Sequence, residues 1–231
     1  MRWSGYRIYP YLYRCLQPLF PHCLWSGSPE ERAIAISYDD GPHPQYTLEL
    51  LDILDRYSIR ANFFWLGERV KAFPDVARMV CDRGHWIGLH GYRHVNFPQL
   101  TPQQLYHSLY QTQQVIIDAC QLEHPQALAR LRDVRPPNGI FLPRTLELLR
   151  EWNYRPVMWS VVPEDWLSPG VAKVCDRTLR QVTNGSLIVL HDGVYGGEGV
   201  AQASDRIISV LLQEGYHFVS VDRLWQSCDR R

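Results

Sequence analysis

The chain has 231 residues, of which 45% are hydrophobic and 21% are charged, and its formal net charge is zero. This composition is typical of one globular domain with a substantial core and excludes a low-complexity chain. Because there is no basic surplus to neutralise phosphates, we expect no nucleic-acid partner. Nothing in the composition indicates an obligate protein partner.

Residues 1–31 form an aromatic-rich N-terminal extension that is interrupted by residues such as Arg7, Pro10 and Arg14. The extension has no continuous apolar run before a small-residue cleavage site, so it resembles neither a signal peptide nor a membrane-spanning helix. We expect it to pack on the main domain, residues 32–231. The alternative is a peripheral membrane contact, since tryptophan, tyrosine and arginine favour the membrane interface.

The six cysteines contain no C-x-x-C pair and no short metal-ligand spacing. They are Cys15, Cys23, Cys81, Cys120, Cys175 and Cys228. In a chain of this size such spacing predicts separate thiols rather than a disulfide framework. The alternative is one pair, Cys15 with Cys23, in an oxidising compartment.

From Arg32 onward, apolar runs typical of strands alternate with segments of helical period. The expected strands are 33–38, 61–66, 86–89, 134–135, 156–161, 187–190 and 218–221. The expected helices are 46–57, 75–83, 102–120, 143–151, 170–182 and 200–213. Thr101-Pro102 is a typical helix start, and Gly84 and Gly215 are typical of helix ends.

Continuously apolar strands that alternate with helices indicate an α/β fold with a parallel sheet covered by helices. About seven such units fit a barrel better than an open sheet. In such barrels the active site gathers where the carboxyl ends of the strands run into the following loops.

Nearly all the unusual polar residues of the chain follow these expected strands. In chain order they are Asp39 and Asp40, His90 and His94, Arg135 and Asn138, Asp165, and His191 and Asp192. The pattern predicts one site at the carboxyl end of the barrel.

His90 and His94 are spaced so that two imidazoles can converge on one ion. A carboxylate from another strand end would complete a set of two histidines and one aspartate, with a position left for water. Taken alone, this spacing is more typical of capping or surface histidines. The neighbouring aspartate pair favours the metal site.

Asp39 and Asp40 suggest a division of roles, in which one carboxylate binds the cation and the other accepts a proton from the activated water. The alternative is an Asx-turn at Gly41-Pro42. His191 is a candidate general acid, since an ordinary histidine titrates near neutral pH. Arg135 is a candidate partner that orients the basic aspartate.

The segments SYDDGPHP, HGYRH, RPPNG, PEDW and LHDG, in this order, resemble the five motifs of the polysaccharide deacetylases. This family is also called the NodB-homology domain or carbohydrate esterase family 4. The segment RANFFWLGERV resembles its second strand, and the resemblance covers about residues 33 to 224. It implies a deformed (β/α) barrel in residues 32–231, one divalent metal and removal of acetyl groups from N-acetylated or O-acetylated sugars.

The resemblance also implies roles for individual residues. Asp39 is similar to the catalytic base, His191 to the catalytic acid and Arg135 to the residue that steers the base. Asp40, His90 and His94 are similar to the metal ligands, with zinc as the first choice and cobalt, nickel or manganese as alternatives. The substrate-binding residues implied are Pro137, Asn138 with its backbone N–H at the oxyanion, and Trp166 and Leu190 as apolar walls of an acetate pocket.

Three positions depart from the family pattern. Gly91 replaces a serine or threonine, and Asn138 replaces an aromatic residue at the rim of the sugar groove. Val162 replaces the first aspartate of the fourth motif, and we expect this to lower the pKa of His191 unless Glu164, Asp165 or Asp192 substitutes. We therefore expect an altered substrate or pH optimum rather than an inert protein.

Two alternatives to a carbohydrate deacetylase stay open. One is an amide hydrolase of the same scaffold that acts on a small non-sugar substrate, and the other is a non-catalytic glycan-binding module. The partner expected is an acetylated glycan. The resemblance favours the cell envelope, but no export signal is evident, so the cytoplasm is the alternative.

Overall fold

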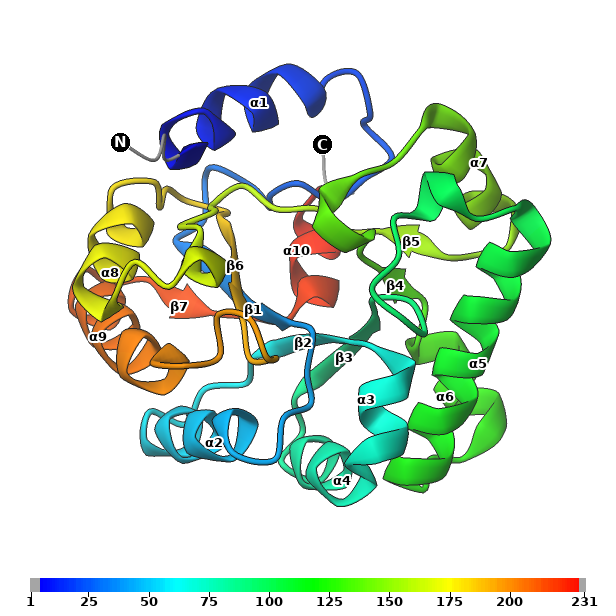
Figure 1. Ribbon diagram of the computed structural model, residues 1–231. Coiled ribbons are helices and arrows are strands. Elements are labelled where there is room, and N and C mark those ends of the chain that lie inside the picture. Colours follow the sequence, from blue (N-terminus) through cyan, green and yellow to red (C-terminus); the bar gives the residue numbers. More distant parts are fainter. Residues whose placement is uncertain (1–4, 229–231) are drawn as a thin grey trace.

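The computed structural model describes residues 5–228 of the chain. Residues 1–4 of the predicted extension and residues 229–231 of the predicted catalytic domain lie outside the described residues. Figure 1 shows a curled sheet in the middle of the molecule, with helices arranged around it.

The strands form one parallel sheet in the order β5-β4-β3-β2-β1-β6, and β7 pairs with the first residues of β1. Their bounds are β1 Ala33–Asp39, β2 Asn62–Trp65, β3 Trp86–Leu89, β4 Asp133–Val134, β5 Arg155–Pro156, β6 Leu187–His191 and β7 His217–Phe218. Every residue of β1 is buried, as its continuous apolar run predicts. This architecture confirms the predicted α/β class and deformed (β/α) barrel.

The expected strand 156–161 is wrong in its extent. Only Arg155–Pro156 belongs to a strand, at the β5 edge of the sheet, and the chain then crosses from beside β4 to the opposite edge at β6. Val157 donates its N–H to Val134 at 2.8 Å, whereas Val161 accepts from the N–H of Val189 at 3.0 Å. A segment that changes its neighbour halfway cannot form one regular ladder, so the barrel closes only through isolated bridges.

The six predicted helices are all present, three of them with the predicted bounds. The described helices are α1 Tyr9–Leu16, α2 Tyr46–Arg56, α3 Gly67–Ala72, α4 Pro74–Asp82, α5 Pro102–Cys120, α6 His124–Arg130, α7 Pro143–Glu151, α8 Val171–Leu179, α9 Val200–Gln213 and α10 Val221–Cys228. Four of these, α1, α3, α6 and α10, were not predicted. None of the helices within residues 5–228 combines the length and apolar character needed to cross a membrane.

The expected strand 218–221 ends early because Val221 begins α10. Asn62 of β2 fixes this change: its side-chain oxygen accepts the backbone N–H of Val221 at 2.7 Å, and its side-chain nitrogen donates to Ile36 of β1 at 3.0 Å. A buried amide therefore satisfies the start of α10 and joins it to two strands.

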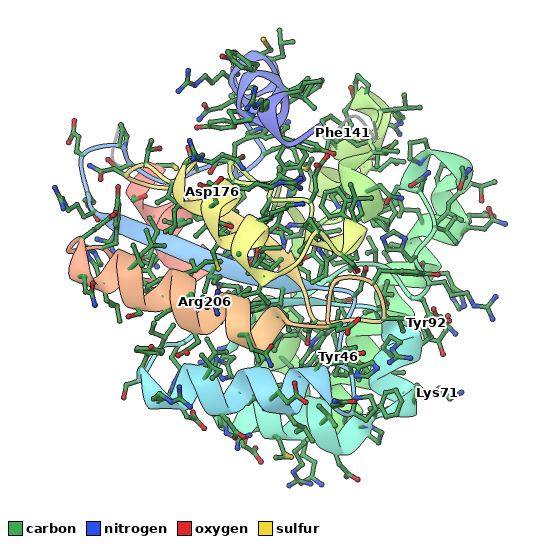
Figure 2. All side chains as sticks on the ribbon, turned by 60° about the vertical axis from the view of Figure 1, so that its left-hand side comes forward. Tyr46, Lys71, Tyr92, Phe141, Asp176 and Arg206 are labelled. Carbon is green, nitrogen blue, oxygen red and sulfur yellow. A yellow bond between two sulfur atoms is a disulfide. The ribbon has the colours of Figure 1, made fainter. Side chains whose placement is uncertain are left out.

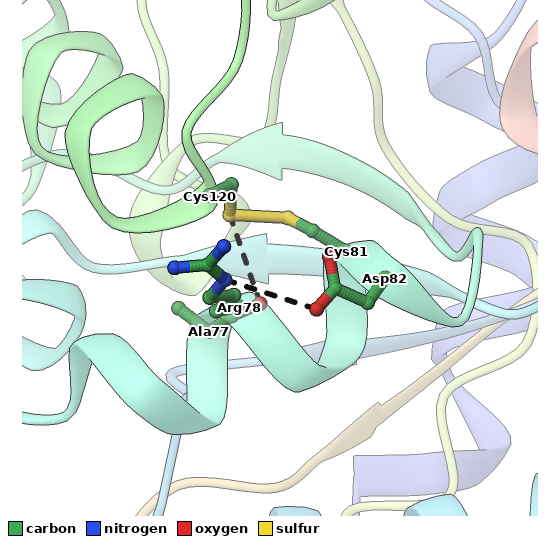
Figure 3. Close-up of a disulfide and its surroundings, with 5 residues drawn as sticks. All are labelled: Ala77, Arg78, Cys81, Asp82 and Cys120. Carbon is green, nitrogen blue, oxygen red and sulfur yellow. Dashed lines mark hydrogen bonds and ion pairs between the residues drawn. A yellow bond between two sulfur atoms is a disulfide. The ribbon is translucent and has the colours of Figure 1, made fainter.

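Cys81 of α4 and Cys120 at the end of α5 form a disulfide, which Figure 3 shows in close-up. The prediction of separate thiols is therefore wrong for this pair, and the alternative pair is also wrong, since Cys15 and Cys23 are free. The two bonded residues are 39 positions apart, so short-range spacing gave no signal. Packing of α4 against α5 brings their Cα atoms to 6.1 Å, within reach of a disulfide.

The N-terminal helix α1 lies at the top of Figure 1, outside the ring of the other helices. The residues of its segment that pack on the core are Tyr9, Tyr13, Leu16 and Phe20, a spacing typical of one helix face. Phe20 contacts Phe141, which Figure 2 labels beneath this helix, with ring centroids 5.0 Å apart.

Candidate active site

The polar residues predicted for the site come together at the carboxyl ends of four strands of the same parallel sheet. Asp39 and His191 are the last residues of β1 and β6, and His90 and Arg135 directly follow β3 and β4. Parallel pairing of these strands places their ends side by side. A cavity of about 390 Å³ opens there, bordered by Asp39, Asp40, His90, His94, Arg135 and His191.

Asp40, His90 and His94 form a cluster of ligand atoms that fits one metal ion. Asp40 Oδ1 lies 3.5 Å from His90 Nε2 and 3.6 Å from His94 Nε2, and the three atoms are all within 4.8 Å of one another. Asp40 Oδ1 is buried and has no hydrogen-bond partner among the described residues. A buried carboxylate oxygen without a donor is costly, and a bound cation would satisfy it.

His90 is held in the form that a metal ligand requires. Its Nδ1 donates a hydrogen bond to the carbonyl oxygen of Arg135 at 2.7 Å, which leaves Nε2 directed at Asp40. Burial lowers the pKa of His90 despite the two neighbouring aspartates, so the imidazole is neutral at pH 7. Fixed tautomer and neutral charge together suit coordination through Nε2.

The loop that carries His94 is positioned by backbone contacts. Gly91 has a φ of +89°, and a Cβ there would lie 3.2 Å from the carbonyl oxygen of Arg93. The carbonyl oxygen of Gly91 accepts from Gly67 at the start of α3, and Ser108 of α5 accepts the N–H of Tyr92 at 2.8 Å. In this chain, glycine at position 91 therefore serves the backbone turn.

Asp39 is paired with Arg135 rather than with the ligand cluster. Arg135 Nη1 donates to Asp39 Oδ1 at 2.5 Å and to Ser37 Oγ at 2.9 Å, and the guanidinium lies 3.9 Å from the centre of the Phe64 ring. Both charged side chains are almost fully buried. Arg135 thereby fixes the carboxylate in one orientation, with Oδ2 4.0 Å from His90 Nε2.

His191 is the register partner of Asp39 on β6, borders the same cavity and is bound by Asp165. Its Nδ1 donates to Asp165 Oδ1 at 2.9 Å, and its backbone N–H donates to Asp165 Oδ2 at 2.7 Å. Burial alone lowers the pKa of His191, but Asp165 and the more distant Asp40 and Asp39 outweigh it and raise the pKa to about 9. Nε2 is the ring nitrogen left for a substrate.

Of the three carboxylates expected to compensate for Val162, Asp165 contacts His191. Glu164 instead pairs with Arg177 at 3.3 Å. Asp192 is buried beneath the turn after Asp40, where it accepts a hydrogen bond from Thr47 at 2.5 Å and burial raises its pKa to about 7. Val162 itself is buried in the wall of the cavity.

The walls of the cavity differ in part from the sequence prediction. Trp166 and Asn138 border it as expected, whereas Leu190 borders a neighbouring cavity on the far side of β6. Val189 lines the site in its place, because side chains alternate along a strand and His191 faces the site. Pro137 is buried behind the exposed Asn138.

Three aromatic residues at the cavity were not predicted. They are Tyr9, Trp159 and Tyr195. Tyr195 belongs to the loop after β6, where the closely spaced Gly193, Gly196 and Gly197 could have drawn attention to it. Trp159 lies in the segment that was predicted as a regular strand, and Tyr9 lies in an unpredicted helix.

Residues 26–157 of the chain match the family model described as polysaccharide deacetylase. The chain belongs to this family. Membership was predicted from the five motifs and is confirmed. A peptidoglycan-N-acetylglucosamine deacetylase of Bacillus cereus is 31% identical over 205 residues, which cover 88% of this chain and 92% of that protein.

Two further comparisons agree with the family. A chitooligosaccharide deacetylase of Rhizobium leguminosarum bv. trifolii is 33% identical over 188 residues, or 79% of this chain and 84% of that protein. The crystal structure of the Bc1960 peptidoglycan N-acetylglucosamine deacetylase superposes with a TM-score of 0.82 at 27% identity, covering 89% of this chain and 93% of that chain. These relatives support carbohydrate deacetylase activity.

Proposed function

We propose that this chain is a metal-dependent hydrolase that removes acetyl groups from N-acetylated or O-acetylated sugars of a glycan. The observation that carries the proposal is the unpartnered Asp40 Oδ1 beside His90 and His94, with Asp39 and His191 bordering the same cavity. This arrangement provides a cation site, a base and an acid at one cavity.

A divalent ion held by Asp40, His90 and His94 would supply an activated water and polarise the acetyl carbonyl. Zinc is our first choice, with cobalt, nickel and manganese as alternatives. Asp39 accepts the proton of the attacking water, and Arg135 holds its carboxylate in one orientation for the transfer. The buried pair thus holds the base in one position.

From the end of β6, His191 Nε2 protonates the leaving nitrogen or oxygen of the sugar as the bond to the acetyl carbon breaks. Asp165 holds Nδ1 in its protonated tautomer and stabilises the imidazolium before transfer. The backbone N–H of Asn138 donates to the developing oxyanion, an interaction often worth about 3 kcal/mol in related chemistry. The products are acetate and a free amine or hydroxyl on the glycan.

The substrate class follows from the relatives, whose names refer to peptidoglycan and chitooligosaccharides. An acetylated glycan of the cell envelope is therefore the substrate that we propose for this chain. The exposed Asn138 at the rim favours one other candidate, a small acetylated amide that needs no aromatic contact at that position.

The test is acetate release by purified protein that has been stripped with a chelator and refilled with zinc or cobalt. The substrates are N-acetylglucosamine oligomers, peptidoglycan, acetylated xylan and a small acetylated amide. We expect metal-dependent release from at least one glycan. Release from the small amide alone would favour the second candidate, and no release from any substrate by the refilled protein would contradict the proposed function.

A further inference from the structure

One wall of the active-site cavity comes from outside the barrel. Tyr9, the first residue of α1, borders the cavity. Its ring lies 5.4 Å from the ring of Trp159 and 6.3 Å from that of Trp166, and both contacts are edge-on, at 87° and 82°. These three rings form a continuous aromatic wall, which we call the Tyr9 wall.

The helix holds Tyr9 at this place through contacts farther along the chain. Tyr13, one turn later, bonds through its hydroxyl to Ser26 Oγ at 2.9 Å and packs on Trp25 at 6.3 Å. Phe20 then packs on Phe141. Since these contacts lie outside the cavity, they fix the helix without explaining why its first residue is an aromatic side chain at the active site.

The Tyr9 wall is connected to the catalytic acid. The ring of Trp166 lies 5.2 Å from the ring of His191, also edge-on at 76°. A sugar whose acetylated nitrogen is at His191 would therefore have its neighbouring unit close to Trp159 and Tyr9. Aromatic rings suit the apolar C–H face of a pyranose.

The hydroxyl of Tyr9 is a hydrogen-bond donor at neutral pH. Burial, with a contribution from Glu164, raises the pKa of Tyr9, so the phenol keeps its proton at neutral pH and is able to donate a hydrogen bond. The family match begins at residue 26, after α1, so Tyr9 is outside the matched segment.

We propose that Tyr9 contacts the glycan, and that α1 thereby adds a subsite for the sugar unit next to the acetylated one. The inference rests on the proposed function, since the ligand is the same acetylated glycan. With this subsite, the binding of oligomers depends on the N-terminal helix more than the binding of a single sugar does.

The experiment measures binding separately from turnover. Calorimetry with N-acetylglucosamine and its short oligomers is carried out on the zinc-loaded protein in the Asp39→Asn background, and acetate release is measured with Asp39 intact. Tyr9→Ala removes the ring and Tyr9→Phe removes only the hydroxyl. Tyr13→Ala is the matched control for a packing residue of α1, and Tyr11→Ala is the control for its solvent face, where Tyr11 is 68% exposed.

We expect Tyr9→Ala to weaken oligomer binding roughly threefold to tenfold, as the loss of one aromatic contact would, with a smaller effect on the monosaccharide. Tyr9→Phe should keep most of the affinity and Tyr11→Ala should keep all of it, whereas Tyr13→Ala, which loosens the helix but keeps the Tyr9 ring, should lose less affinity than Tyr9→Ala. With Asp39 intact, Tyr9→Ala should raise KM for oligomers and leave kcat within about twofold.

Equal loss of thermal stability in Tyr9→Ala and Tyr13→Ala, with unchanged oligomer affinity in both, would overturn the inference and leave α1 as a packing element. Absence of oligomer binding by the parent protein would overturn it too. Tyr9-dependent binding without acetate release from any substrate would support the subsite while the proposed function failed. Acetate release from oligomers that does not change when Tyr9 is replaced would support the proposed function and overturn the subsite.

Discussion

Asp165 binds His191 twice, through the ring Nδ1 at 2.9 Å and through the backbone N–H at 2.7 Å. One carboxylate therefore fixes the tautomer of the histidine, its charge and the position of its main chain. The position of Val162 carries no charge, yet His191 keeps an acidic partner, because Asp165 begins a short helical turn that faces the end of β6.

The first prediction concerns the pH dependence set by this pair. The pKa of His191 is raised to about 9, so the acid form is present at neutral pH and is lost as the pH rises through that value. Asp165→Asn removes the charge and should move the basic limb of the kcat profile to lower pH. A bound cation would lower the pKa of His191 in the parent protein, but Asp165→Asn would still lower it further. An unchanged basic limb would contradict the role of Asp165.

The same shift predicts a pH-dependent contribution to stability. Because the folded-state pKa lies above the ordinary value of about 6.5, the stabilisation by His191 is complete below that pH and is lost as the pH rises through about 9. Urea unfolding of the metal-free protein across this range should show the loss, and Asp165→Asn should remove most of it. Parallel stability profiles for the two proteins would exclude this linkage.

Arg135 should matter for folding as well as for turnover. Its side chain and that of Asp39 are 1% and 5% exposed, so Arg135→Met would leave a buried carboxylate without its partner. Removal of one partner of such a pair costs about 3–5 kcal/mol in the free energy of unfolding. Urea denaturation measures this loss, and Arg144→Met on the exposed face of α7 is the control, for which we expect little change because the ion pair is in solvent.

Gly196 should be required for the geometry of His191. It has a φ of +88°, and a Cβ there would lie 2.9 Å from His191 Cβ and 3.1 Å from Asp165 Oδ2. Gly196→Ala should therefore lower kcat while metal content stays the same. Gly170→Ala is a matched control, since Gly170 has a φ of +92° but no atom within 4 Å of the added Cβ. The positive φ should cost both variants about 1–3 kcal/mol of stability, and the clash with His191 should add a further loss in Gly196→Ala. An equal loss of kcat in both would refute the contact argument.

The disulfide should stabilise the fold without taking part in the site. Cys81→Ser opens a link between residues 39 positions apart, and such links are typically worth about 2–4 kcal/mol. Thermal unfolding should show the loss, while KM and kcat of the folded variant stay unchanged because α4 and α5 do not border the cavity. Cys15→Ser, which removes an exposed free thiol, should change neither the thermal stability nor the two kinetic constants.

Much of this structure was predictable from the sequence because the signals were local. The bounds of α5, α7 and α9 follow from helical period and from terminal proline and glycine residues, and polar residues at strand ends indicated the site. Pairing of Arg135 with Asp39 was predicted from the family pattern and agrees with the geometry.

The features that the sequence did not reveal depend on contacts between distant segments. The pair Cys81–Cys120 follows from the packing of two helices, and the course of 157–161 follows from a change of neighbouring strand. Tyr9 reaches the cavity because the start of α1 lies beside it, although the spacing of Tyr9, Tyr13 and Leu16 was a helical signal among prolines and arginines. Val189 was missed because Leu190 was assigned to the wrong face of β6.

The central claim is that Asp40 holds a cation and Asp39 acts on the water, and one paired measurement tests it directly. Bound zinc and acetate release are determined on the same samples of the parent protein, Asp39→Asn and Asp40→Asn. We predict that Asp39→Asn keeps one zinc per chain and loses turnover, whereas Asp40→Asn loses both. Zinc lost from Asp39→Asn but retained by Asp40→Asn, or undiminished turnover in Asp39→Asn, would contradict the assignment.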